Sequence, residues 1–153
     1  MRQLNPRWVA GVRRVVNDCP YFQLQSMRLD GLEWGESELS IALDTKHLQP
    51  FGLVHGGVAA SLVDAAAFWA LYTQTPEGCG LTTVEMKLNY LSPLKSGRLL
   101  GRGKVIRLGR SLGLAESRLL DQEGNLAAHG TATLMVLPSL SLWGESDLPP
   151  KHL

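Results

Sequence analysis

This chain of 153 residues has only two cysteines, nearly equal numbers of basic and acidic side chains, and no apolar stretch long enough to span a membrane. The two cysteines, Cys19 and Cys79, stand far apart and outside any cysteine–histidine cluster, so neither a disulfide framework nor a zinc site is expected. The 15 basic and 14 acidic side chains form no long run, which argues against nucleic acid as a partner. No stretch reaches the roughly 18 apolar residues of a membrane span, and the N-terminus lacks the apolar core of a signal peptide. We therefore expect a cytoplasmic protein that binds no membrane and needs no metal or other cofactor.

The composition points to one domain that associates with copies of itself. A chain of this length fits one domain with a real core. We assign that domain to residues 1–138 and treat residues 139–153 as a tail, for which the pattern predicts neither a strand nor a helix. Only 19% of the residues are charged and 44% are hydrophobic, which leaves few charges to cover an isolated globule. Burial between subunits would relieve that shortage.

Two helices of different character are predicted. From Pro6 to Val16 the apolar residues recur at spacings of three and four, which is typical of a short amphipathic helix. Gly56-Gly57 opens a second, alanine-rich run from Val58 to Thr75 that is apolar almost all the way round. A helix of the second kind has to be buried.

Alternating apolar and polar residues predict strands on both sides of the long helix. Two of them are expected between Phe22 and Leu43 as a hairpin, with turn residues at Asp30-Gly31 and Trp34-Gly35. Four more consecutive antiparallel strands are expected at Leu81–Leu91, Arg98–Leu108, Leu112–Leu120 and Leu126–Val136. The fold class is therefore α+β, with one curved antiparallel sheet wrapped around the long helix.

One carboxylate interrupts the apolar helix. Between Lys46 and Glu77 the only formally charged side chain is Asp64, and burying an unpaired carboxylate costs several kcal/mol or shifts its pKa. Two interpretations remain open. Asp64 either accepts hydrogen bonds that fix the packing, or it acts as a nucleophile or general base.

A second candidate group precedes the helix. The amides of Gly56 and Gly57 fall in the first helical turn, at the positive end of the helix dipole, where they can stabilise an oxyanion. His55 lies nine residues before Asp64, which on a helix is about 13 Å of rise and the opposite face. If both ends act on one carbonyl, the carboxylate and the amide must come from different subunits.

The segment from Gln49 to Gly57, followed by Asp64, resembles the hotdog-fold thioesterases of the phenylacetate-pathway and aroyl-coenzyme A type. The similarity runs from about Leu39 to Leu137. It implies a hotdog domain that hydrolyses an acyl-coenzyme A thioester and assembles as a homo-oligomer, such as a dimer of dimers. In that resemblance Asp64 is the reacting acid and faces the Gly56 amide of a neighbouring subunit, Gln49 orients the carbonyl or water, and His55 shapes the loop.

Further residues are expected to contact the substrate. Some members of the family carry a small hydroxyl residue four positions after the acid, where this chain has Phe68, a departure that narrows the acyl pocket. Phe68 and Tyr72 lie one and two turns beyond Asp64, where their rings either favour an aromatic or short acyl group or simply pack the core. Gly57 is a further candidate contact. The turn that carries Arg107, Arg110 and Ser111 offers groups for the phosphates of coenzyme A, unless these side chains are merely solvated.

Other functions fit parts of the same pattern. A non-catalytic module that binds or senses acyl-coenzyme A would keep the pocket without requiring Asp64 in register with His55-Gly56. A hydratase or dehydratase of the same fold would use a catalytic histidine and acid at a different spacing from that of His55 and Asp64. A purely structural oligomerisation domain has no use for a carboxylate amid alanine and valine.

Overall fold

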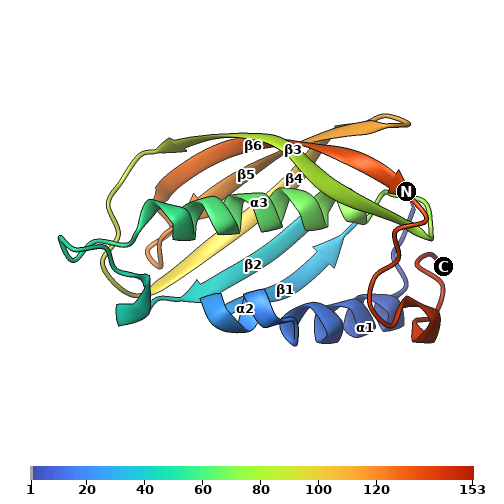
Figure 1. Ribbon diagram of the computed structural model, residues 1–153, viewed down its shortest axis with the longest axis horizontal. Helices are drawn as coiled ribbons and strands as arrows, with labels where there is room; N and C mark the ends of the chain where they lie inside the picture. The colour runs from blue at the N-terminus through green and yellow to red at the C-terminus, as the bar shows by residue number, and fades with distance from the viewer. Residues whose placement is uncertain (1) are drawn as a thin grey trace.

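The long apolar helix, α3 (Gly56–Tyr72), lies in the concave face of a six-stranded antiparallel sheet (Figure 1). This arrangement comes from a computed structural model, which describes residues 2–153. Small residues allow the helix backbone to approach the sheet closely: a Cβ added to Gly103 of the sheet would lie 2.0 Å from the carbonyl oxygen of Ala66. That carbonyl accepts a hydrogen bond from Ser37 Oγ at 2.7 Å, so the buried hydroxyl is satisfied. The predictions of the α+β class and of a buried central helix are confirmed.

All six expected strands are present. They are β1 (Met27–Glu33), β2 (Glu36–Ala42), β3 (Cys79–Tyr90), β4 (Arg98–Leu108), β5 (Leu112–Leu120) and β6 (Leu126–Pro138). The expectation that the last four are consecutive neighbours is wrong for one of them, because the order across the sheet is β1-β2-β4-β5-β6-β3. Helix α3 carries the chain across the sheet from β2, so β3 forms the far edge and pairs with β6. Alternation identifies a strand but does not identify its partner.

The N-terminal segment contains one helix more than the sequence predicts. Helix α1 (Pro6–Asn17) is confirmed, and a second, α2 (Pro20–Gln25), follows it where strand-like alternation was expected to begin. Six residues are too few to show helical periodicity, although Pro20 stands at the first helical position, where proline is favoured. The β1–β2 hairpin turns at Trp34-Gly35, with Gly35 at φ 80°. Asp30-Gly31 was also expected to be a turn, but it lies at a bulge within β1.

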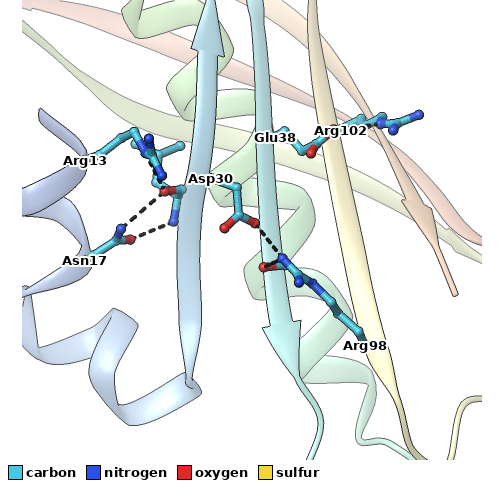
Figure 2. A network of polar contacts seen from close by, with 8 residues as sticks. Arg13, Asn17, Asp30, Glu38, Arg98 and Arg102 are labelled. Atoms are coloured by element: carbon cyan, nitrogen blue, oxygen red, sulfur yellow. Dashed lines mark hydrogen bonds and ion pairs between the residues drawn. The ribbon is translucent and has the colours of Figure 1, made fainter. Parts of the chain in front are cut away.

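Helix α1 covers the edge formed by β1, at the opposite side of the sheet from β3 (Figure 1). The Asn17 side chain takes the place of a neighbouring strand: its Oδ1 accepts from Leu29 N–H at 2.7 Å, and its Nδ2 donates to Leu29 C=O at 3.2 Å (Figure 2). On the other side of β1, Arg98 of β4 reaches across β2 to Asp30 at 3.3 Å. The β1 edge is therefore protected from pairing with another chain.

The C-terminal tail, left unassigned by its sequence, is held against the body at the C-terminal end of α3 (Figure 1). It contains a short 3-10 helix, η2 (Glu145–Asp147), and ends in a bridge between Leu4 and His152. Lys151 is only 2% exposed, and its ammonium donates to the carbonyl oxygens of Tyr72 at 2.8 Å and Thr75 at 2.9 Å. These carbonyls lie at the negative end of the helix dipole, so a cation is stabilised there.

The buried Lys151 should make stability depend on pH. Burial lowers its pKa from 10.5 to about 8, so between those values the unfolded chain binds more protons than the folded chain, and stability rises with pH. Lys151→Met removes this group. Between pH 7 and 10 the free energy of unfolding of the wild type should gain about 2–3 kcal/mol relative to Lys151→Met, as urea titrations at both pH values would measure. Identical pH dependence in the two proteins would contradict the assignment.

None of the helices within residues 2–153 is long and apolar enough to cross a lipid bilayer.

Candidate functional site

The loop before α3 is anchored by a buried histidine that the sequence did not single out. His47, 2% exposed, ends the 3-10 helix η1 (Thr45–His47). Its Nδ1 accepts from the backbone N–H of Asp44 at 2.9 Å, its Nε2 lies 2.8 Å from the Gln25 carbonyl, and its own carbonyl accepts from His55 N–H at 2.8 Å. The loop that carries Gln49 and His55 is therefore fixed at both ends.

His55 caps α3 with its side chain. Its Nδ1 accepts a hydrogen bond from Gly57 N–H at 2.8 Å, which occupies one of the amides that a helix leaves unpaired at its start. No hydrogen bond from Gly56 N–H is found among residues 2–153. Of the two glycine amides, Gly56 is thus the one available to an external acceptor.

The groups before the helix line one cavity of about 470 Å³, which Gln49, His55, Gly56 and Tyr90 share. Gln49 closes its own loop, because its side-chain oxygen accepts from the backbone N–H of Phe51. Tyr90, at the end of β3, donates from its hydroxyl to the Gly56 carbonyl at 2.9 Å. Three of the predicted residues therefore come together at the N-terminal end of α3.

Asp64 lies on the one face of α3 that the sheet leaves uncovered. Along this face the residues are half-buried or exposed, whereas those on the other faces are buried; the uncovered residues are Gly57, Ala60, Ser61, Asp64, Ala65 and Phe68. Full burial of an unpaired carboxylate, expected from the sequence, is therefore not found in the single chain. Asp64 Oδ1 accepts a hydrogen bond from the Thr83 hydroxyl of β3 at 2.6 Å, which fixes the orientation of the carboxylate.

Within one chain the carboxylate and the glycine amide remain apart. Gly56 and Asp64 are eight residues apart on the same helix, which corresponds to about 12 Å along its axis. A single acyl carbonyl is too small to contact both groups across that distance. The site is therefore divided between two regions of the chain, with Asp64 and Thr83 in one and Gln49, His55 and Gly56 in the other.

Beyond Asp64, α3 carries a cluster of aromatic side chains. Phe68 stacks on Tyr72 with ring centroids 6.2 Å apart and meets Trp69 edge-on at 5.1 Å. Phe68 is half-buried, while Tyr72 is buried, and that burial raises the pKa of its phenol. The three rings line a second cavity, of about 230 Å³, together with β3 and the tail. These rings pack against the core and also line the cavity, so packing and contact with an acyl group are compatible roles for them.

The predicted phosphate contacts lie elsewhere. All three are exposed: Arg107 lies near the end of β4, and Arg110 and Ser111 lie in the turn between β4 and β5. That turn stands at the C-terminal end of α3, because the nearby Gly113 packs against the side chain of Leu71. The structure does not bring these residues together with Gly56 in one chain.

Two residues next to the candidate groups escaped the sequence analysis. Thr83 and Tyr90 both stand in β3, where alternation marks them only as strand residues. No local signal could have found them, because each contacts a partner 19 or more positions away in the chain.

The chain is similar to known proteins over most of its length. A family model described as the thioesterase superfamily matches residues 51–128. A relative from Saccharolobus solfataricus, whose name describes an esterase, is 30% identical over 128 residues, which are 84% of this chain and 85% of the relative. The proofreading thioesterase EntH of Klebsiella pneumoniae is 32% identical over 106 residues, which are 67% of this chain and 77% of EntH. A solved thioesterase structure from Haemophilus influenzae has a TM-score of 0.80 at 22% identity and covers 87% of this chain and 92% of that chain, which shows a shared fold.

Proposed function

The chain belongs to the thioesterase superfamily and has its hotdog fold; from that premise we propose that it hydrolyses an acyl-coenzyme A thioester, with Asp64 as the reacting carboxylate. One observation carries the proposal. Asp64 stands on the uncovered face of an otherwise buried apolar helix, and Thr83 holds its carboxylate in place. A carboxylate that served only to fix the packing would be expected on a buried face of the helix instead.

The chemistry follows one of two routes. As a general base, Asp64 takes a proton from a water that attacks the thioester carbon; the C–S bond of the tetrahedral intermediate then breaks, and the thiolate leaves with that proton. As a nucleophile, Asp64 attacks the carbon directly, expels the thiolate and forms a mixed anhydride, which water then hydrolyses. Because Phe68 leaves no hydroxyl one turn after Asp64, Thr83 is the nearby hydroxyl that orients the carboxylate in either route.

The oxyanion that develops on the carbonyl would be held by Gly56 N–H of a second subunit. Two features of the single chain support that role: this amide has no partner within residues 2–153, and it lies at the positive end of the α3 dipole. Gln49 borders the same cavity and would orient the carbonyl or the water. His55 is already engaged with Gly57, which suits a residue that shapes the loop.

A second copy of the chain would complete the site. β3 is an edge strand with exposed apolar side chains, Val84 at 53%, Met86 at 37% and Tyr90 at 59%, so it offers a second copy both unpaired backbone groups and apolar surface. A two-fold axis beside β3 would also bring together the uncovered faces of two α3 helices and form two equivalent sites. We propose a homodimer of this kind, which can pair further into a dimer of dimers.

The substrate is proposed to be an aromatic or a short- to medium-chain acyl-coenzyme A, as in thioesterases of the phenylacetate-pathway and aroyl-coenzyme A type. Phe68 and Tyr72 line a cavity that accommodates a compact acyl group. The exposed Arg107, Arg110 and Ser111 would contact the phosphates of coenzyme A. In this proposal the coenzyme A is part of the substrate, and hydrolysis requires no metal or other cofactor.

The test is release of free thiol from aromatic, short-chain and medium-chain acyl-coenzyme A thioesters by the purified protein. Thiol together with the free acid is the expected result. An enoyl product would instead indicate a hydratase or dehydratase. Tight binding of the thioesters without turnover would indicate a binding or sensing module and would overturn the proposal.

A further inference from the structure

The tail lies directly against the strand that carries Thr83. A Cβ added to Gly80 of β3 would lie 2.8 Å from both the Cδ2 atom and the carbonyl oxygen of Leu140, so only glycine allows this approach. The tail is also fixed further along: Gly78 N–H, just before β3, donates to Glu145 Oε1 at 3.4 Å, and Lys151 donates to the Tyr72 carbonyl at the end of α3. It therefore forms a wall held at both ends.

This wall lines one side of the cavity of about 230 Å³. α3 contributes aromatic rings to the cavity, β3 contributes Gly80 and Leu81, and the tail contributes Leu140, Leu142 and Trp143. An apolar cavity of about 150 Å³ is known to hold benzene. The space therefore fits a single ring or a short chain.

The cavity begins one helical turn from the proposed reacting carboxylate. Phe68 follows Asp64 by four residues, which on α3 is about 6 Å along the same face. On β3, Leu81 and Thr83 are two residues apart and point to the same side of the strand, and Thr83 bonds to Asp64. An acyl group whose carbonyl lies at Asp64 would thus extend between α3 and β3 toward the tail.

From this continuity we infer that the C-terminal tail is the end wall of the acyl-binding cavity and limits the length of the acyl group that is hydrolysed. The inference rests on the proposed function and adds a determinant of specificity to it. The matched family segment ends at residue 128, so this wall is built from residues outside that segment. Leu140 lies against Gly80 of β3, and Trp143, 72% exposed, lines the cavity beside it.

The inference is tested by shortening the wall. Kinetic constants are measured for wild type and Leu140→Ala on butyryl-, hexanoyl-, octanoyl- and decanoyl-coenzyme A. Leu140→Ala should raise the ratio of kcat/KM for decanoyl over butyryl thioester about tenfold, because a pocket that ends too soon discriminates by about that factor per methylene. The matched control is Leu148→Ala, which truncates the same residue type where the tail packs on α1 at Gly11, and it should leave the ratio unchanged.

A replacement variant and a binding titration distinguish failure of the inference from failure of the proposed function. If Leu140→Ala misfolds, Trp143→Ala replaces it, because truncation of an exposed side chain costs little stability. The same thioesters are also titrated into Asp64→Asn protein with and without Leu140→Ala. Because this protein turns over little substrate, the titrations measure how binding affinity depends on the length of the acyl chain. An unchanged ratio in an active Leu140→Ala enzyme, or an equal change in Leu148→Ala, would overturn the inference and leave the proposed function standing. If the wild type turns over no thioester, the proposed function fails, and equal selectivity in the two titrations then overturns the inference as well.

Discussion

Asp64→Asn should lower kcat for thioester hydrolysis by about 10²–10⁴-fold, the range typical for loss of a general base. The amide is a poor base and a poor nucleophile, yet it has the size of the carboxylate. Its side-chain oxygen can still accept the hydrogen bond from Thr83 that Asp64 accepts at 2.6 Å. The fold and the oligomeric state should therefore be unchanged.

The measurement is thiol release at saturating substrate, together with circular dichroism and size-exclusion chromatography of the same preparations. Glu33→Gln is a matched control, because it neutralises an exposed carboxylate on β1, at the far edge of the sheet from β3. It should retain wild-type turnover. Near-normal activity in a folded Asp64→Asn protein would remove Asp64 from the mechanism and leave it as a packing residue.

Gly56→Pro should lower kcat by about 10²–10³-fold, the usual effect of losing one oxyanion donor. Proline removes the N–H of residue 56, and it is well tolerated at the first position of a helix, which Gly56 occupies. The preceding residue, His55, already has the extended conformation that proline requires, with φ −62° and ψ 136°. The change therefore deletes a donor with little disturbance of the backbone.

Gly56→Ala is the matched control for this deletion. Alanine and proline both add a Cβ, which would lie 3.0 Å from the Tyr90 hydroxyl, and the ring of Tyr90 is 59% exposed and can shift. Only proline lacks the N–H. If the two variants lose activity equally, crowding rather than the missing donor is responsible, and the proposed role of Gly56 is wrong.

Mixing the two inactive variants tests whether the site is shared between subunits. In a dimer that joins Asp64→Asn to Gly56→Pro, one site carries both changes and the other carries neither. Random co-assembly of equal amounts makes half of the dimers mixed, so about a quarter of the wild-type activity should return. Co-refolding of the two variants followed by the thiol assay measures this recovery. No recovery from a confirmed heterodimer would place Asp64 and Gly56 of each site in the same chain.

Much of the fold follows from local patterns. The apolar run after Gly56-Gly57 specifies a buried helix, and the boundaries of β4 and β5 agree with the alternation that predicts them. Two of the wrong predictions concern features that local patterns do not encode. The predicted position of β3 in the sheet was wrong, because the pairing of strands depends on the path of the whole chain and not on the pattern within one strand. Helix α2 was missed because six residues are too short for a periodic signal.

Periodicity and residue type are local properties, and they were enough to predict α1, α3 and the six strands and to point to the groups capable of chemistry. An acid isolated in an apolar helix, and glycines at the start of that helix, are evident from the order of the residues alone. The packing of the whole chain sets which face of α3 stays uncovered, brings Thr83 to Asp64 and ties the tail to the end of α3 through Lys151. These contacts join residues 19 and 79 positions apart, and such pairs are selected by the packing of the whole chain rather than by any local preference.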